Sequence, residues 1–269
     1  MTLNIVGEGD TFWEGWKIWH TYAPEMVKHG IYVWYSAMAG NIIAQPFVAP
    51  GMAKAEVEDL LEPMLSRLDA AGVTYTRSDV TTFPNFSALY DEMWYTAFHG
   101  ANTQAAFGGR LISLKDLVEN GDGLIGAFRY VLEKYPFVGF GGHLVNPGNG
   151  VADPKGELSA VHPVWRETAD VGVYLYIIEE CLSAERRAEV LDQLTFDIGG
   201  AIRRETPNSA VYSNEGDINE PNWQDAFWGP VYPKLVKIKE KYDKERVFWT
   251  KATPGSETWE LVDERLCKA

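Results

Sequence analysis

The sequence has few cysteines, no long apolar run and little positive charge. Two cysteines, Cys181 and Cys267, cannot form a disulfide framework, and no set of metal-ligating residues accompanies them. No stretch of eighteen apolar residues could cross a membrane, and Met1–Val6 lacks the basic and apolar regions of a secretory signal, so we expect a soluble, cytoplasmic chain. A net charge of −14 repels polyphosphate, so we do not expect nucleic acid as a partner.

The common catalytic signatures are also missing. Neither G-x-S-x-G nor H-E-x-x-H occurs, and the five histidines show no ligand spacing. Gly139–Gly142 is rich in glycine, but it lies within an expected strand and opens no helix, so it does not predict a dinucleotide site. His143 and His99 are the histidines most suited to line a pocket, because both stand beside glycines in aromatic surroundings. The other histidines are expected to be structural.

Apolar periodicity predicts an α+β fold. The order helix, strand, strand, helix, strand occurs twice, which predicts one large antiparallel sheet built from two β-β-α-β units with helices on one face. The aromatic-rich segment 83–109 between the units is either a wall over a pocket or a long connection packed on the core. Helices are expected at 10–30, 54–71, 123–135 and 183–204, and strands at 31–38, 42–48, 73–76, 137–145, 171–178 and 210–212.

The segment from Tyr212 to Gly229 has the highest density of chemically useful side chains. Glu215 follows a short expected strand and is close in sequence to three large aromatic residues, Trp223, Phe227 and Trp228. A carboxylate enclosed by aromatic rings is a better base than one in water, because burial disfavours its charged form. The residues alone leave the alternative open that Glu215 is a capping or loop acid on the surface.

The same segment carries a family resemblance. It resembles the berberine-bridge segment of fungal-type FAD-linked oxidases, the berberine bridge enzyme-like members of the vanillyl-alcohol oxidase family, and upstream motifs resemble the substrate domain of that family. The motifs that carry the resemblance are Tyr212-x-Asn214-Glu215-x-Asp217, Trp223-Gln224-x-x-Phe227-Trp228-Gly229, Val247-Phe248-Trp249, Ala49-Pro50-Gly51, Gly141-Gly142-His143 and Ala160-Val161-His162-Pro163.

The resemblance implies roles for individual residues. Glu215 matches the position of an active-site base, with Tyr212 as the second catalytic candidate and Asn214 beside it in the pocket. Trp228 and Tyr232 are expected near the isoalloxazine edge of FAD. Together with the aromatic and histidine arguments above, the predicted substrate pocket comprises Asn214, His143, His99, Trp223 and Phe227. One position departs from the family pattern, since Val231 stands where an asparagine usually contacts the flavin.

Three functions therefore compete. The first is the substrate domain of an FAD-linked oxidoreductase of secondary metabolism, which acts on a mostly apolar small molecule and is completed by a flavin domain that this chain lacks. The second is a flavin-free descendant that cyclises, isomerises or dehydrates a hydrophobic metabolite, and the third is a non-catalytic binding subunit. We expect a substrate-binding domain at 1–207 and a berberine-bridge-like, helical segment at 208–269 that packs on it. Without a flavin domain we expect the aromatic face of Trp228, Tyr232 and Trp249 to be partly exposed, and a flavin-domain chain or a second copy is its expected partner.

Overall fold

A seven-stranded antiparallel sheet forms the centre of the molecule. The computed structural model describes residues 1–93, 105–148, 159–178, 182–262 and 265–269. The strands follow the order β4-β1-β3-β2-β6-β7-β5, and each neighbouring pair is antiparallel. They comprise β1 (Leu3–Val6), β2 (Tyr32–Met38), β3 (Asn41–Val48), β4 (Thr74–Arg77), β5 (Ala105–Ser113), β6 (Val138–Leu144) and β7 (Thr168–Ile177).

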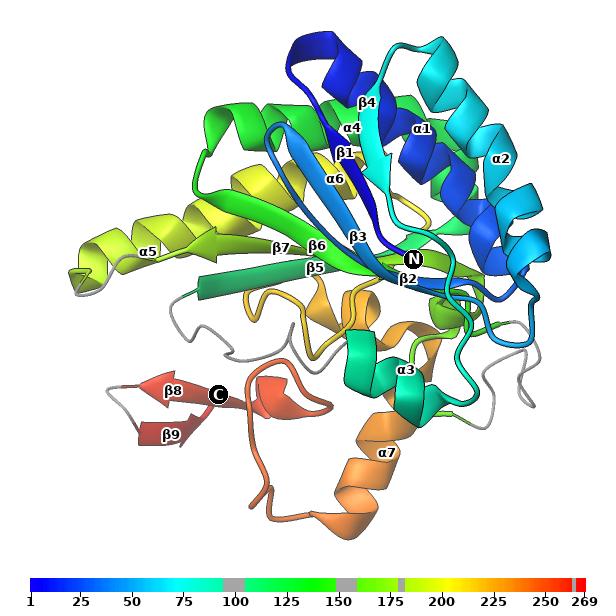
Figure 1. Cartoon of the computed structure of the whole chain (residues 1–269). Coiled ribbons are helices and arrows are strands. Elements are labelled where there is room, and N and C mark those ends of the chain that lie inside the picture. The colour runs from blue at the N-terminus through cyan, green and yellow to red at the C-terminus, as the bar shows by residue number, and fades with distance from the viewer. Residues whose placement is uncertain (94–104, 149–158, 179–181, 263–264) are drawn as a thin grey trace.

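A layer of helices covers one face of this sheet (Figure 1). At its centre, α1 buries Trp16 and Trp19 completely, and Trp16 packs against Phe128 and Phe140. Gly15 lets α1 approach the strand layer, since a β-carbon there would lie 2.8 Å from Val73. The helices of the layer are α1 (Gly9–Lys28), α2 (Lys54–Ala70), α4 (Leu114–Lys134), α5 (Ala184–Asp192) and α6 (Gly199–Glu205), with a π-helical turn at Gln193–Ile198.

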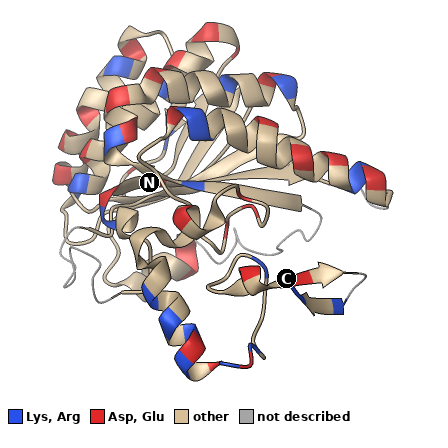
Figure 2. Cartoon of the chain, turned by 180° about the vertical axis from the view of Figure 1, so that it is seen from behind, with Lys and Arg blue, Asp and Glu red and all other residues tan. Residues whose placement is uncertain are grey.

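The strand alternation sends a second set of side chains to the opposite face of the sheet, which we call the far face. In β2, Val33 and Tyr35 are buried on the helix side, whereas Tyr32 and Trp34 alternate with them and lie on the far face. Charged residues gather on the helices and are sparse on the strands (Figure 2). The far face therefore carries little charge, although it includes uncharged polar side chains such as Ser36, Asn41 and Gln45.

The C-terminal segment and α3 (Phe86–Met93) lie on the far-face side (Figure 1). Buried charges attach the segment to the sheet: Glu220 pairs with Arg203 at 2.8 Å and with Arg110 at 3.8 Å. Burial raises the pKa of Glu220, although the two cations act against that rise. The segment contains α7 (Tyr232–Tyr242) and a separate hairpin of β8 (Trp259–Val262) and β9 (Arg265–Lys268).

The expected α+β fold with one large antiparallel sheet and its helices is confirmed. Three local expectations are wrong. The helix expected at 123–135 begins at Leu114, where Ser113 caps it, and it continues through non-helical angles at Asn120. The strand expected at 210–212 is reduced to one bridge between Leu111 and Ala210, because the chain turns away into the C-terminal segment.

The third wrong expectation concerns the element order that was expected to occur twice. Each half begins with a strand that was not among the expected elements, β1 in the first and β5 in the second, and only the first half ends with a strand. Part of the aromatic-rich segment 83–109 is α3 and part is β5, while residues 94–104 lie outside the described residues. Cys181 also lies outside them, so its pairing with Cys267 is not described.

Candidate functional site

Two strands bring Tyr32 and His143 together on the far face. Tyr32 is the first residue of β2 and His143 the penultimate residue of β6. The Tyr32 hydroxyl and His143 Nδ1 are 2.6 Å apart, and the two rings stack with centroids 5.7 Å apart. Trp34 is the register partner of His143 across the β2–β6 pair, so the indole borders the same spot.

The C-terminal segment adds Glu215 to this pair. A turn closed by the Glu215 amide and the Tyr212 carbonyl (3.0 Å) positions it. Gly109 of β5 makes the approach feasible, because a β-carbon there would lie 2.7 Å from the Glu215 carbonyl oxygen. The charge of Glu215 acts on both Tyr32 and His143. Among the described residues, its buried Oε2 atom has no hydrogen-bond partner.

The surroundings set the protonation of the pair. Burial lowers the pKa of His143, and the negative charges of Glu215 and Asp170 oppose that shift. Burial, followed by the charge of Glu215, raises the pKa of Tyr32 to about 12. Near neutral pH, Tyr32 is therefore protonated and donates to an uncharged His143. Glu215 Oε2, which has no hydrogen-bond partner among the described residues, is an acceptor atom available to a bound molecule.

A second polar cluster lies behind this site, on the helix side of the sheet. Asp170 Oδ2 accepts a hydrogen bond from the Tyr35 hydroxyl at 2.8 Å and lies 3.2 Å from His20 Nε2. All three side chains are almost completely buried. Gly142 leaves room for the carboxylate, because a β-carbon there would lie 3.0 Å from Asp170 Oδ1 and 2.5 Å from the Val171 carbonyl. Gly142 of β6 thus serves close packing, as expected.

The other predicted site residues take separate positions. Tyr212 packs edge-on against Trp165 at 5.2 Å, and Asn214 is exposed. Trp223 packs edge-on against Tyr232 at 5.6 Å, and Phe227 is buried in a cluster with Val211 and Ala252. His99 lies outside the described residues.

The two predicted cofactor contacts, Trp228 and Tyr232, make hydrogen bonds within the C-terminal segment. Trp228 Nε1 donates to the Ala252 carbonyl at 3.4 Å, and the Tyr232 hydroxyl donates to Glu257 at 2.6 Å. Burial raises the pKa of Tyr232 to about 12, and the hydrogen bond to Glu257 acts in the same direction. Whether either residue contacts a cofactor stays a prediction.

The surroundings of Glu215 differ from the expected ones. Sequence proximity suggested an enclosure by Trp223, Phe227 and Trp228; these aromatic residues gather around Val211 and Ala252, and the Phe227 ring approaches Gly216, the residue after Glu215. The groups that feel the charge of Glu215 are Tyr32 and His143, and Tyr32 was not predicted. The signal for it lay in the alternation of β2, which places Tyr32 on the face opposite the buried Val33.

The described part of the chain holds neither a cluster of metal-ligating side chains nor a membrane-spanning helix. No group of three or more His, Cys, Asp or Glu side chains there is arranged to hold a metal ion. No helix in that part has the length and apolar character needed to span a bilayer.

Comparison with known proteins supplies the family context. Residues 211–253 match the family model described as "Berberine and berberine like". The chain is 27% identical over 275 residues to the FAD-linked oxidoreductase sor8 of Hypocrea jecorina, covering 100% of this chain and 45% of that protein. It is 30% identical over 216 residues to the FAD-linked oxidoreductase easE of Arthroderma benhamiae, covering 78% of this chain and 41% of the relative.

Solved structures agree with the fold. The VAO-type flavoprotein MtVAO615 from Myceliophthora thermophila C1 superposes with a TM-score of 0.86 at 22% identity, over 100% of this chain and 49% of that one. A second VAO-type flavoprotein from the same organism, MtVAO713, gives the same TM-score at 23% identity, over 100% of this chain and 50% of that one. The chain thus spans about half the length of the relatives that it matches.

Proposed function

We propose that the chain, which is similar to berberine bridge enzyme-like, VAO-type FAD-linked oxidoreductases, forms the substrate-binding half of such an oxidase. Residues 1–207 would provide the sheet over the substrate, and residues 208–269 would form the segment that packs on it and carries the base. The substrate in this proposal is a mostly apolar small organic molecule, in keeping with the sparse charge of the far face (Figure 2).

One observation carries the proposal: Glu215 holds a buried, unpartnered carboxylate oxygen, and its charge acts on the hydrogen-bonded pair of Tyr32 and His143. A buried polar atom without a partner costs free energy, so its retention favours a role in binding or catalysis. The three residues come from β2, β6 and the C-terminal segment. Only the folded chain assembles them.

The far face next to these residues suits a flat ring system. Gly139 and Gly141 present no side chain, and Gly141 is the register partner of Ser36. A β-carbon at Gly139 would make only ordinary contacts from 3.8 Å, whereas one at Gly141 would lie 3.2 Å from the Tyr35 carbonyl oxygen. The isoalloxazine of FAD would lie against this strip of glycines. The sequence contains no strand-turn-helix glycine motif for the pyrophosphate, so that part of FAD would be held by a flavin domain.

The chain's own residues would orient the substrate and manage its proton. FAD, when bound, accepts a hydride from the substrate. Glu215 would accept the proton released from the substrate's hydroxyl, amine or carbon centre. The Tyr32 hydroxyl, which holds His143 Nδ1 at 2.6 Å, would fix the imidazole so that its other nitrogen donates toward the substrate. Tyr212, which begins the turn that ends at Glu215, would position the base.

Exposed apolar residues on the far face support a covering partner. Phe107 of β5 is 43% exposed and lies in register with Leu175, which pairs in turn with Gly139. Apolar surface of this kind marks an interface. We propose that a flavin domain covers it. If a second copy covers it instead, the purified chain will elute as a dimer, and Phe107→Ser will convert it to a monomer.

The test uses the chain together with a flavin domain of its family. We expect the complex to show a flavin absorbance band near ~450 nm. Glu215→Gln should slow flavin reduction by substrate by about 10²–10⁴-fold, while Glu260→Gln, an exposed acid on β8, should leave it unchanged. Undiminished reduction by Glu215→Gln would remove Glu215 from the mechanism. A complex that forms but never binds flavin would overturn the oxidase assignment.

A further inference from the structure

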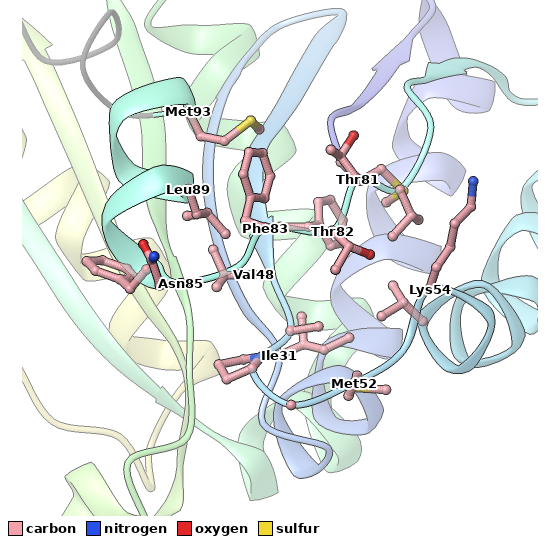
Figure 3. A pocket seen from close by; sticks show the side chains of 18 of the residues that line it. Ile31, Val48, Met52, Lys54, Thr81, Thr82, Phe83, Asn85, Leu89 and Met93 are labelled. Carbon is pink, nitrogen blue, oxygen red and sulfur yellow. The ribbon is translucent and has the colours of Figure 1, made fainter.

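A cavity of about 430 Å³ lies beside the Tyr32–His143 pair and is not explained by the proton chemistry above. Its walls come from the start of β2, the end of β3 with the following turn, the first turn of α2, the loop 80–85 and α3. Its volume lies within the range of small-molecule sites, about 300–1,000 Å³. Figure 3 shows Leu89 and Met93 of α3 on one side, Ile31 and Met52 on the other, and Val48 and Phe83 between them.

The strand register joins this cavity to the candidate site. Val48, which lines the cavity, is the direct partner of Tyr32 in the β2–β3 pair. Directly opposite residues of an antiparallel pair project to the same face, with Cβ atoms about 4.5–5.5 Å apart. Tyr32 in turn hydrogen-bonds His143. A molecule that occupies the cavity would therefore extend toward Tyr32.

The lining favours an uncharged ligand. Lys54 is the one charged side chain among the described residues that line the cavity. Its amino group lies 3.7 Å from Glu58 and its side chain is 49% exposed, so its charge belongs to the surface of α2. Met1, Met52 and Met93 contribute flexible thioethers that adapt to varied apolar shapes. A net charge of −14 further disfavours anions.

We propose that this cavity binds the uncharged, apolar portion of the substrate and holds it so that the reacting end reaches Tyr32, His143 and Glu215. The inference rests on the proposed function in so far as it calls the ligand a substrate. Binding to the cavity is tested without flavin or turnover. If no apolar molecule binds, the chemistry assigned to Glu215 still stands. If the flavin test fails, a cavity that binds still stands as an apolar ligand site.

The methionines offer a readout with internal controls. The chain, labelled with ¹³C at the methionine methyl groups, is titrated with N-phenyl-1-naphthylamine, an uncharged apolar probe, and the signals are assigned with Met→Leu variants. We expect saturable shifts at the cavity residues Met1, Met52 and Met93. Met26 and Met64, which are buried in the core, and Met38, which is 50% exposed, should not shift. Absence of shifts at the cavity residues, or equal shifts at Met38, would overturn the proposal.

A charged analogue tests the ligand class. 1-Anilinonaphthalene-8-sulfonate carries the same ring system with an added anionic group. We expect it to bind at least about tenfold more weakly, because burial of an unpaired charge is unfavourable. Equal or tighter binding of the sulfonate would show that the cavity selects anions and would contradict the uncharged class.

A variant in which the cavity is filled tests whether the probe binds there. Leu89→Trp places a larger side chain in the wall on α3 and should weaken binding of N-phenyl-1-naphthylamine by about tenfold or more. Leu261→Trp on β8, where Leu261 is 64% exposed, is the matched control and should bind like the parent chain. If Leu89→Trp is folded by circular dichroism and still binds with unchanged affinity, the probe sits elsewhere and the proposal is wrong.

Discussion

Tyr35→Phe removes one hydroxyl from the polar cluster behind the site. The hydroxyl donates to Asp170 Oδ2 at 2.8 Å, and Tyr35 is 1% exposed. Phenylalanine keeps the edge-on ring contacts to Trp19 and His20, so packing changes little. Asp170 Oδ1 already lacks a partner among the described residues, and Oδ2 would keep only His20. The substitution therefore isolates one hydrogen bond to a buried carboxylate.

The expected loss of unfolding free energy is about 1.5–3 kcal/mol, the usual value for a hydrogen bond to a charged group. Tyr130→Phe is the matched control, because the Tyr130 hydroxyl donates to Asp197 Oδ1 at the same 2.8 Å distance but Tyr130 is 39% exposed. Water replaces the lost partner there, so the control should cost less than about 1 kcal/mol. The Tyr130 hydroxyl also accepts a hydrogen bond from Lys134 Nζ at 2.7 Å, so a smaller cost in the control, despite this second contact, is due to its exposure.

The cost of Tyr35→Phe should depend on pH. Burial raises the pKa of Tyr35 well above 10, and the charge of Asp170 adds to that rise. The unfolded parent chain releases this proton near pH 10 while the native chain keeps it, so the parent loses stability as pH rises above 10. The variant lacks the group. The difference between the two chains should therefore shrink by about 1.4 kcal/mol per pH unit above 10.

Equilibrium urea unfolding, followed by tryptophan fluorescence, measures these differences at pH 7 and again between pH 10 and 11. The reasoning is refuted if Tyr130→Phe costs as much as Tyr35→Phe at pH 7. It is also refuted if the cost of Tyr35→Phe grows with pH above 10.

Three further substitutions test one close packing contact and two carboxylate hydrogen-bond networks of the fold. Gly142→Ala should lose about 1–3 kcal/mol in urea unfolding, because its β-carbon would lie 2.5 Å from the Val171 carbonyl, while Gly139→Ala on the same strand, with 3.8 Å of clearance, should be neutral. Equal costs would contradict this. Asp116→Asn should lose about 2–3 kcal/mol, because the buried carboxylate accepts from the Asn208 amide (3.1 Å) and from Ser209; an unchanged unfolding midpoint would refute it. Asp197→Asn should cost under about 1 kcal/mol at pH 7. Burial opposes the shift, but hydrogen bonds from Lys134 and Tyr135 lower the pKa of Asp197 to about 2, so this cost should vanish as pH falls from about 4 toward 2. A cost that persists at pH 2 would contradict it.

The fold was readable from the sequence where periodicity was strong. The apolar stripe of α2 and the hairpin of β2 and β3 follow directly from spacing, and Gly72 adopts the positive φ that a helix end favours. β5 was missed because it contains Gly108 and Gly109, which break the apolar alternation. These glycines are needed for contacts that the sequence does not display, with Tyr174 and with the Glu215 backbone.

Only part of the site could be predicted from the sequence. Glu215 and His143 were identified separately, and the structure places His143 within the electrostatic reach of Glu215. The site depends on tertiary contacts that no local pattern reveals. The hydrogen bond between Tyr32 and His143, for example, joins residues 111 positions apart in sequence. The π-helical turn at Gln224–Trp228 places Phe227 in a cluster with Val211 and Ala252, and its ring lies close to Gly216, the residue after Glu215.

The central claim is that Glu215 and His143 act as one electrostatically coupled site. The most direct test is an NMR titration of the His143 imidazole in the parent chain and in Glu215→Gln. Burial lowers the pKa of His143 from 6.5, and Glu215 partly restores it. We predict that Glu215→Gln lowers the His143 pKa further, while Glu260→Gln leaves it unchanged. A His143 pKa that stays the same or rises in Glu215→Gln would contradict the account.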